Sequence, residues 1–182
     1  MTPRSLTRDL SAHELASLVT GLGRRPGLWA HLVEHDPSRR VYKELWRDNH
    51  VAVWLICWME DHDTGFHDHD LSSGAVTVAA GSVCEERLAL VGAPIVRTFD
   101  AGETFDFSAS DIHRVLHVGD EPAVTLHAYS PPLSRMGSYA VRDNGVLTRV
   151  SLPYAEELRP LSEDSPQAPR LDHVEESAQP MA

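Results

Sequence analysis

The sequence predicts an all-β fold, a jelly-roll barrel with a small N-terminal helical cap, and three observations support this prediction. First, apolar runs rich in β-branched residues, such as Val51–Trp58 and Gly74–Ala80, have the length of strands. Second, Gly, Asp and Pro residues separate these runs at a spacing typical of a sandwich or barrel. Third, a helical period marks the start of the chain, before about residue 41. The 182 residues suffice for one such domain.

The helical cap is expected within residues 1–36. Apolar residues in Leu15–Val19 repeat at helical spacing, and Ser11 followed by Glu14 has the spacing of a capping box. A second short helix is expected over Pro26–His35, where Leu and Val residues form an apolar stripe.

The barrel is expected over residues 37–155, so that residues 1–155 form a single domain. Its further strand candidates are Cys84–Val91, Ile95–Phe99, Thr104–Phe107, Arg114–Val118, Ala123–Tyr129 and Ser138–Val141. Residues 156–182 are rich in Pro, Glu, Ser and Gln and have no apolar period. This last segment is expected to be a flexible acidic tail.

The charge and the cysteines of the chain exclude several classes of function. Lys and Arg number 16 against 27 Asp and Glu, and a formal charge of −11 disfavours nucleic acid and anionic membranes as partners. Cys57 and Cys84 have no CxxC spacing, so neither a disulfide scaffold nor a structural zinc site is expected. No apolar run suggests a signal peptide or a membrane span. We expect a cytoplasmic protein, either a monomer or a weak homo-oligomer.

The strongest local signal for chemistry is an HxH pair in the segment Phe66–Asp70. In an extended strand His67 and His69 would share one face, where two neutral imidazoles can chelate a metal ion. A third ligand is available in His113, at the entrance of a predicted strand. The alternative is that the pair consists of exposed loop histidines.

The surroundings of the pair resemble the cupin motif. His67, His69 and Gly81 are in register with the first half of that motif, whereas Gly74 occupies its glutamate position. Loss of the glutamate with retention of three histidines is the pattern of the thiol dioxygenase branch of cupins.

The resemblance to the cysteine dioxygenase family is closer and covers residues 42–139. The run WMEDHDTGFHDH, which begins at Trp58, is similar to the segment that leads into the HDH ligands of that family. The runs HRV from His113 and EPAVTLHAYSPPL from Glu121 resemble its second half. The resemblance also implies a cis peptide bond at Ser130–Pro131.

This resemblance implies roles for five residues. His67, His69 and His113 correspond to the iron(II) ligands, and His127 and Tyr129 to the catalytic pair beside the metal. The Tyr129 hydroxyl would hydrogen-bond to oxygen or substrate, and His127 would orient it. Without the resemblance, Tyr129 is explained as an aromatic that fills the barrel and His127 as a core histidine.

Two departures from the family pattern, at Gly74 and His117, do not concern the charge of the substrate. Gly74 stands where some members have a cysteine that forms a thioether with the active-site tyrosine, so Tyr129 is expected to be unmodified. Cys84 lies on a later strand and is expected to be a small buried residue. His117 stands where asparagine is common, and both a polar core residue and an added active-site group are open explanations.

Another departure concerns the substrate. The family holds a substrate carboxylate with an arginine two residues after a tyrosine in an early strand. The matching residues here are Tyr42 and Glu44, and we assign both to substrate binding. A carboxylate at Glu44 would attract a cation, so the expected substrate is a cationic thiol such as ergothioneine or cysteamine rather than plain cysteine. Alternatively, Glu44 is a surface charge, or Lys43 turns inward.

The sequence thus predicts a non-haem iron(II) thiol dioxygenase that adds both atoms of O2 to the sulfur of a small thiol and forms a sulfinate. A dioxygenase for cysteine or 3-mercaptopropionate is one alternative. A non-catalytic metal-binding cupin that acts as a sensor is another, and a metal-cupin enzyme for a non-thiol substrate is a third.

Overall fold

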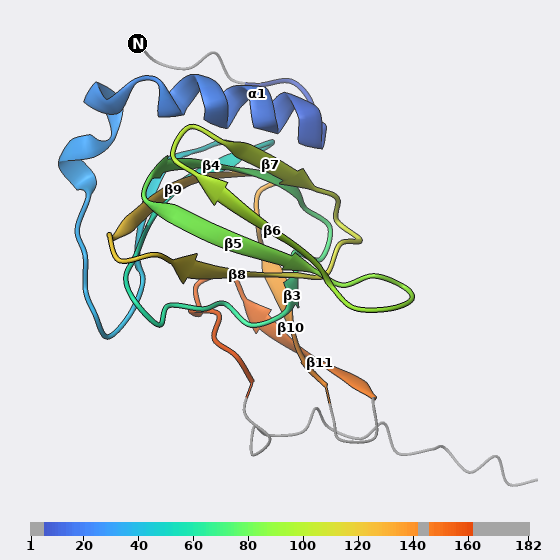
Figure 1. The fold of residues 1–182 in the computed structure, drawn as a ribbon. Coiled ribbons are helices and arrows are strands. Elements are labelled where there is room, and N and C mark those ends of the chain that lie inside the picture. Colours follow the sequence, from blue (N-terminus) through green and yellow to red (C-terminus); the bar gives the residue numbers. More distant parts are fainter. Residues whose placement is uncertain (1–5, 142–145, 162–182) are drawn as a thin grey trace, which may run out of the picture.

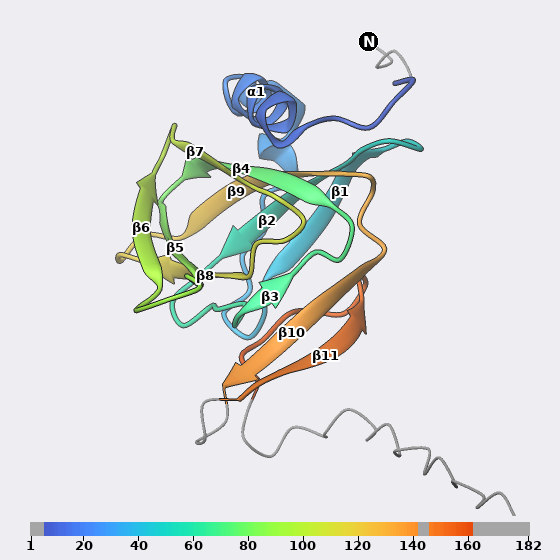
Figure 2. The ribbon, with the colours of Figure 1, turned by 90° about the vertical axis from the view of Figure 1, so that its right-hand side faces the viewer.

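The computed structural model describes residues 6–141 and 146–161, which form two facing antiparallel sheets with one helix outside them (Figure 1, Figure 2). The first sheet has the order β1-β2-β9-β4-β7 and the second the order β11-β10-β3-β8-β5-β6. The all-β prediction is confirmed, although the sheets stay open and do not close into a barrel.

In chain order the strands are β1 (Val41–Arg47), β2 (Ala52–Trp58), β3 (His67–Asp68), β4 (Ser73–Ala80), β5 (Ser82–Arg87), β6 (Ile95–Asp100), β7 (Thr104–Phe107), β8 (His113–Val118), β9 (Ala123–Ser130), β10 (Arg135–Val141) and β11 (Leu147–Pro153).

Both faces of strand β2, which lies between β1 and β9, are buried, which explains the continuous apolar run in its sequence. Ile56 and Trp58 belong to the core between the sheets, while Leu55 and Cys57 belong to a cluster on the opposite face. Side chains alternate between the two faces of a strand, so one apolar run supplies both layers. The core between the sheets also contains Val76, Val78, Val83, Phe99, Phe105, Phe107, Val115 and Met136.

Helix α1 (Ala12–Gly23) covers the outer face of the first sheet (Figure 1). Its fully buried residues Leu15 and Val19 pack into a cluster with apolar residues of β2, β4 and β9. Ser11 and Glu14 form the capping box that the sequence predicts. The helical cap is therefore confirmed, and it leaves the inner face of the same sheet free to line a site.

Several elements differ from the sequence prediction. The helix expected over Pro26–His35 is a pair of 3-10 helices, Pro26–Leu28 and Ala30–Leu32, in a stretch that contains the poor helix former Gly27. Strand β5 ends at Arg87, and Leu90 and Val91, which the prediction placed in this strand, are exposed. The peptide bond Ser130–Pro131 is cis, as predicted.

The chain after β11 packs against the first sheet beyond the expected domain end at residue 155. Leu158 is buried, and Glu157 accepts a hydrogen bond from the backbone N–H of Arg40. The expectation of a flexible tail otherwise falls on residues 162–182, which lie outside the described part of the chain. No helix within the described residues has the length and apolar character needed to cross a membrane.

Candidate metal centre and its cavity

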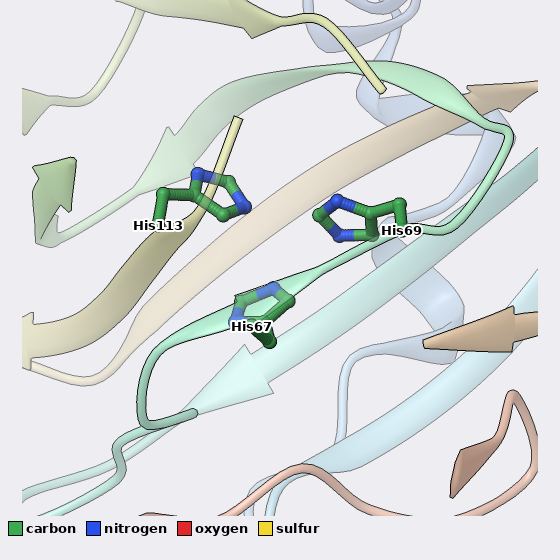
Figure 3. Close-up of side chains that lie close together, drawn as sticks. All are labelled: His67, His69 and His113. Carbon is green, nitrogen blue, oxygen red and sulfur yellow. The ribbon is translucent and has the colours of Figure 1, made fainter. Parts of the chain in front are cut away.

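Three histidines meet on the inner face of the second sheet (Figure 3). His67 begins β3, His69 follows the end of this two-residue strand, and His113 begins β8. His67 and His113 are direct partners in the antiparallel register of β3 and β8. One ring nitrogen from each residue lies within 4.8 Å of the others, and all three side chains are buried. The structure brings together the three residues that the sequence assigned to a metal.

Hydrogen bonds hold two of these rings so that one nitrogen of each stays free. His67 Nδ1 donates to the Gly65 carbonyl at 3.0 Å, and His113 Nδ1 contacts Glu85 Oε1 at 2.8 Å. His113 Nε2 and His69 Nδ1 are buried and find no hydrogen-bond partner among residues 6–141 and 146–161. Buried polar atoms are rarely left unpaired, so these nitrogens fit a metal ion as their missing partner.

Burial keeps the three rings neutral, which is the form that coordinates a metal. It lowers the pKa of His67 to about 4. Burial, followed by the charges of neighbouring histidines, holds the pKa of His69 and of His113 well below the ordinary value. A set of three imidazole nitrogens suits iron(II) and other first-row transition metals.

Glu85 is a buried carboxylate that the sequence reasoning missed. It lies on the inward face of β5, contacts His113 Nδ1, and accepts a hydrogen bond from Arg87 Nη2 at 2.8 Å. Arg87 in turn pairs with Asp111 at 3.1 Å. An acidic residue two positions after the buried Val83, on the same face of an apolar strand, was the available signal. Glu85 fixes the orientation and the tautomer of a candidate ligand.

Tyr129 and His127 lie beside the three histidines in a chain of hydrogen bonds. The Tyr129 hydroxyl is 3.1 Å from His127 Nδ1, and His127 Nε2 is 2.7 Å from the Thr125 hydroxyl. The Trp58 indole donates to that hydroxyl at 2.7 Å. The Tyr129 ring centroid is 5.1 Å from that of His69. Alternation along β9 places residues 125, 127 and 129 on the inner face, so the predicted pair is joined to the core.

Phe107 occupies the space beside Gly74. The two residues are cross-strand partners in the pairing of β4 with β7, and Gly74 also pairs with Tyr129 of β9. A Cβ atom at position 74 would overlap with the Phe107 ring. This ring stacks on His69, with centroids 4.5 Å apart and planes at 21°. Gly74 therefore makes room for an aromatic ring against a candidate ligand, and it supplies no thiol to Tyr129.

A cavity of about 530 Å³ opens onto the three histidines, Tyr129 and His127. This volume is within the range of small-molecule sites. Aromatic side chains of β1 and β2 form one wall, and the chain after β11 forms another. The lining includes Arg40, Tyr42, Trp54, Trp58, Phe107, Met136, Tyr154, Glu157 and Leu158.

Glu44 does not line this cavity, and the argument from its charge is corrected by the structure. Its side chain is exposed and accepts a hydrogen bond from Arg47 Nε at 2.7 Å. Tyr42 and Glu44 lie in continuous register with β2, and the shift in β1 comes only after Glu44, so the pairing with Arg47 and not the register separates Glu44 from the cavity lining. Tyr42 does line the cavity.

Arg40 is a buried basic residue that lines the cavity, as does the exposed Arg39, and the sequence reasoning missed both. Arg40 lies two positions before Tyr42, and alternation along an extended chain was the available signal. His117 is absent from the cavity lining, and its Nε2 is 2.9 Å from the Glu121 carbonyl.

Comparisons with known proteins agree with this geometry. The model of the family "Cysteine dioxygenase type I" matches residues 6–142. Cysteine dioxygenase type 1 of Bos taurus is 23% identical over 144 residues, which cover 74% of this chain and 72% of the bovine protein. The Rattus norvegicus protein of that name is 24% identical with the same coverage. The solved structure of TT1209 from Thermus thermophilus matches at a TM-score of 0.51 and 16% identity, covering 57% of this chain and 93% of that one.

The two-sheet fold and the histidine cluster define a cupin with a candidate metal centre. The family match is more specific, because it spans most of the described residues: the chain belongs to the cysteine dioxygenase type I family. This membership places it among the thiol dioxygenases, a class of oxidoreductases. The resemblance seen in the HDH and HRV…YSPP runs is confirmed.

Proposed function

We propose that the protein is a non-haem iron(II) dioxygenase that oxidises a small thiol to a sulfinate. The observation that supports this best is the cluster of three buried, neutral imidazoles beside the Tyr129 hydroxyl. In this proposal His67, His69 and His113 hold the metal, and Tyr129 and His127 act on substrate and oxygen.

The proposed reaction is balanced without a further reductant. A thiol R–SH and O2 give R–SO2H, in which sulfur loses four electrons and the two oxygen atoms gain them. Iron(II) bound by the histidines would supply the redox chemistry for this transfer. Three neutral ligands leave the positive charge of the metal uncompensated, which favours a thiolate in the site.

Tyr129 contributes a proton donor in this proposal. Burial raises the pKa of Tyr129 well above its ordinary value, so the hydroxyl keeps its proton. Burial also lowers the pKa of His127 to about 3, so this ring stays neutral and serves to orient the hydroxyl. A neutral O–H next to the metal can hydrogen-bond to bound substrate or oxygen without adding charge.

The proposed substrate is larger than plain cysteine. The cavity, at about 530 Å³, is within the range of sites that hold small organic ligands. The aromatic wall suits an apolar or ring-bearing part of such a thiol. A cationic thiol such as ergothioneine or cysteamine is no longer favoured by Glu44, because that residue is outside the lining.

We further propose a cytoplasmic location and a monomer or weak homo-oligomer. Cys57 and Cys84 are free and buried, which fits a reducing compartment. Sedimentation of the purified protein would test the oligomeric state.

The function is tested with iron-loaded protein and a panel of thiols under 18O2. The expected result is oxygen consumption with one class of thiol and a product that carries two labelled oxygen atoms. His67→Ala, His69→Ala and His113→Ala should each lose iron and turnover, whereas His117→Ala, outside the cavity, should keep both. A protein that binds iron but consumes no oxygen with any thiol would point instead to a non-catalytic metal-binding cupin.

A further inference from the structure

The strand that carries the first candidate ligand makes few pairing contacts of its own. β3 has only two residues, His67 and Asp68, and His69 lies just beyond its end. It pairs with β8 through one pair of residues and with β10 through two pairs. The spacing between His67 and His69 therefore depends on further contacts that this segment makes.

His69 is the candidate ligand whose ring lacks a hydrogen bond. The rings of His67 and His113 are each held through a hydrogen bond of Nδ1. The ring of His69 has no such partner in the part of the chain that the structure describes, although it stacks on Phe107. Histidines that bind metals usually have a partner that sets the direction of the ring. The placement of His69 therefore relies on this stacking and on its backbone.

Asp68 anchors that backbone from the other face of the strand. Its side chain points away from the two histidines, because successive residues of a strand face opposite sides. The residue is buried, and its carboxylate accepts five hydrogen bonds. Oδ1 accepts from the backbone N–H of Asp70 at 2.9 Å, from that of Gly137 at 3.1 Å and from Arg149 Nη2 at 2.8 Å. Oδ2 accepts from the Tyr139 hydroxyl at 2.5 Å and from Arg149 Nε at 2.6 Å.

Most of these donors belong to the strand pair β10–β11, which lies beside β3 at the end of the second sheet (Figure 2). Tyr139 of β10 and Arg149 of β11 are direct partners in the register of the two strands. The guanidinium binds the carboxylate through two N–H groups, an arrangement that adds geometric specificity to the attraction of opposite charges. One carboxylate thus ties the ligand segment to both strands.

Gly137 leaves room for this ion pair. It lies directly opposite Asp68 in the pairing of β3 with β10. A Cβ atom at position 137 would overlap with the Arg149 guanidinium and with Asp68 Oδ2. Glycine weakens a strand and often marks a place where another group approaches the backbone closely. Here the group is the guanidinium that reaches across β10 to Asp68.

We propose that Asp68 is a positioning residue of the metal centre, which, through Arg149 and Tyr139, fixes the backbone of β3 and thereby the placement of the His67 and His69 rings. This inference rests on the proposed function, which supplies the metal ligands, and extends it to the strand pair β10–β11. Arg149 lies beyond the match to the family at residues 6–142.

Metal binding tests this proposal without thiol or oxygen. Co(II) is titrated into the metal-free full chain, and its affinity and visible absorption spectrum are recorded, because the spectrum depends on the arrangement of the ligands. We expect Asp68→Asn to weaken Co(II) binding at least about 10-fold and to change the spectrum, since the amide cannot accept both N–H groups of the guanidinium. Arg149→Met should cause a similar loss.

Further variants locate the effect in the ion pair. The double variant Asp68→Asn/Arg149→Met should bind Co(II) within a few-fold of Asp68→Asn alone, because the two residues act through one contact. Arg149→Lys keeps the charge without the planar fork and should give an intermediate affinity. Arg135→Met is the matched control, since Arg135 is an exposed arginine of β10 that lies 3.5 Å from Asp70. It should change neither affinity nor spectrum.

A purely structural role for Asp68 gives a different result. Asp68→Asn would then lower the free energy of unfolding in urea, while the folded variant kept the Co(II) affinity and spectrum of the unsubstituted protein. That outcome overturns the proposal. If Asp68→Asn does not fold, Arg149→Lys decides: weaker Co(II) binding in the folded variant supports the proposal, and unchanged binding overturns it.

These outcomes separate this proposal from the proposed function. Loss of Co(II) affinity in Asp68→Asn, with no oxygen consumption by the iron-loaded unsubstituted protein, would preserve the positioning role and remove the dioxygenase. Thiol oxidation by the unsubstituted protein, with unchanged Co(II) binding in Asp68→Asn, would do the opposite. An unsubstituted protein that binds no metal would exclude both.

Discussion

Glu85 shows how one buried side chain can set the properties of a metal site without touching the metal. It contacts Nδ1 of His113 and leaves Nε2 to point toward the other histidines. Its own carboxylate is held by Arg87, whose charge offsets the cost of burying an acid. Partners of this kind tune ligand orientation and basicity.

We predict that Glu85→Gln weakens metal retention by 10- to 100-fold, the usual range for loss of such a partner. The amide can still accept from Nδ1 but carries no charge to stabilise the ring. Iron content after dialysis against a graded chelator series would measure this. Glu86→Gln is the control, because Glu86 is the neighbouring acid and pairs with Arg114 instead. Equal iron retention in both variants would show that Glu85 has no role at the metal.

Tyr129→Phe should keep iron and lose most of the yield of sulfinate per O2 consumed. The substitution removes only a hydroxyl that is 3.1 Å from His127 and is not among the predicted ligands. The measurement is iron content together with product and oxygen on the same sample. Intact mass should also match the unmodified sequence, because Gly74 offers no thiol; a thioether between Tyr129 and Cys57 or Cys84 would refute this.

Strand β9 illustrates how an element organises function at the next scale. Its inner face carries Thr125, His127 and Tyr129, and its outer face carries the apolar residues that pack toward α1 and the cap. All eight of its residues are buried. A strand buried on both faces is rigid. The hydrogen bonds that join its side chains Thr125, His127 and Tyr129 are therefore kept within a narrow range of geometry.

The packing of Gly74 in β4 against Phe107 in β7 can be tested by substitution. Gly74→Ala should destabilise the protein by about 1–3 kcal/mol, since the added methyl overlaps with the Phe107 ring in a filled core. Urea unfolding of Gly74→Ala, Phe107→Leu and the double variant forms a mutant cycle. Leucine at position 107 is smaller than phenylalanine and should relieve part of the overlap with the added methyl group. The losses in the free energy of unfolding of the two single variants should therefore not add up to the loss in the double variant. Additive changes would mean that the ring does not fill this space.

At the scale of the whole molecule, residues of both sheets and of the chain after β11 line the cavity. The candidate ligands come from the second sheet, and Tyr129 and His127 come from the first. The cavity therefore depends on how the sheets face each other. The same packing buries His67, His69, His113 and His127 in their neutral form.

Buried neutral histidines predict acid sensitivity of the metal-free protein. The pKa of His127 is about 3 in the folded state, against about 6.5 when unfolded. Between these values the unfolded chain binds more protons, so the free energy of unfolding falls as pH falls, by up to about 1.4 kcal/mol per pH unit for this residue. Urea midpoints from pH 7.5 to 4.5 would measure the slope. His127→Gln should reduce it, whereas exposed His31→Gln should not.

The sequence by itself determined the features that local periodicity encodes. A period of two predicted that His67 and His69 share one face, whereas the pairing of His127 with Tyr129 was expected from the resemblance to the family. Apolar runs located most strands, and the capping box marked the start of α1. These features depend on neighbours a few residues apart, so they can be identified without knowledge of the fold.

Only the tertiary structure decided which distant residues meet at the site. Glu85 reaches His113 through the register of β5 with β8. Arg40 becomes a cavity residue because residues 157–158 return to cover it, while the Glu44 side chain is exposed and pairs with Arg47. A change of one residue in register reverses the face of every later side chain, and contacts across the sheets leave no local pattern. For this reason the charge of the proposed substrate site could not be obtained from sequence spacing.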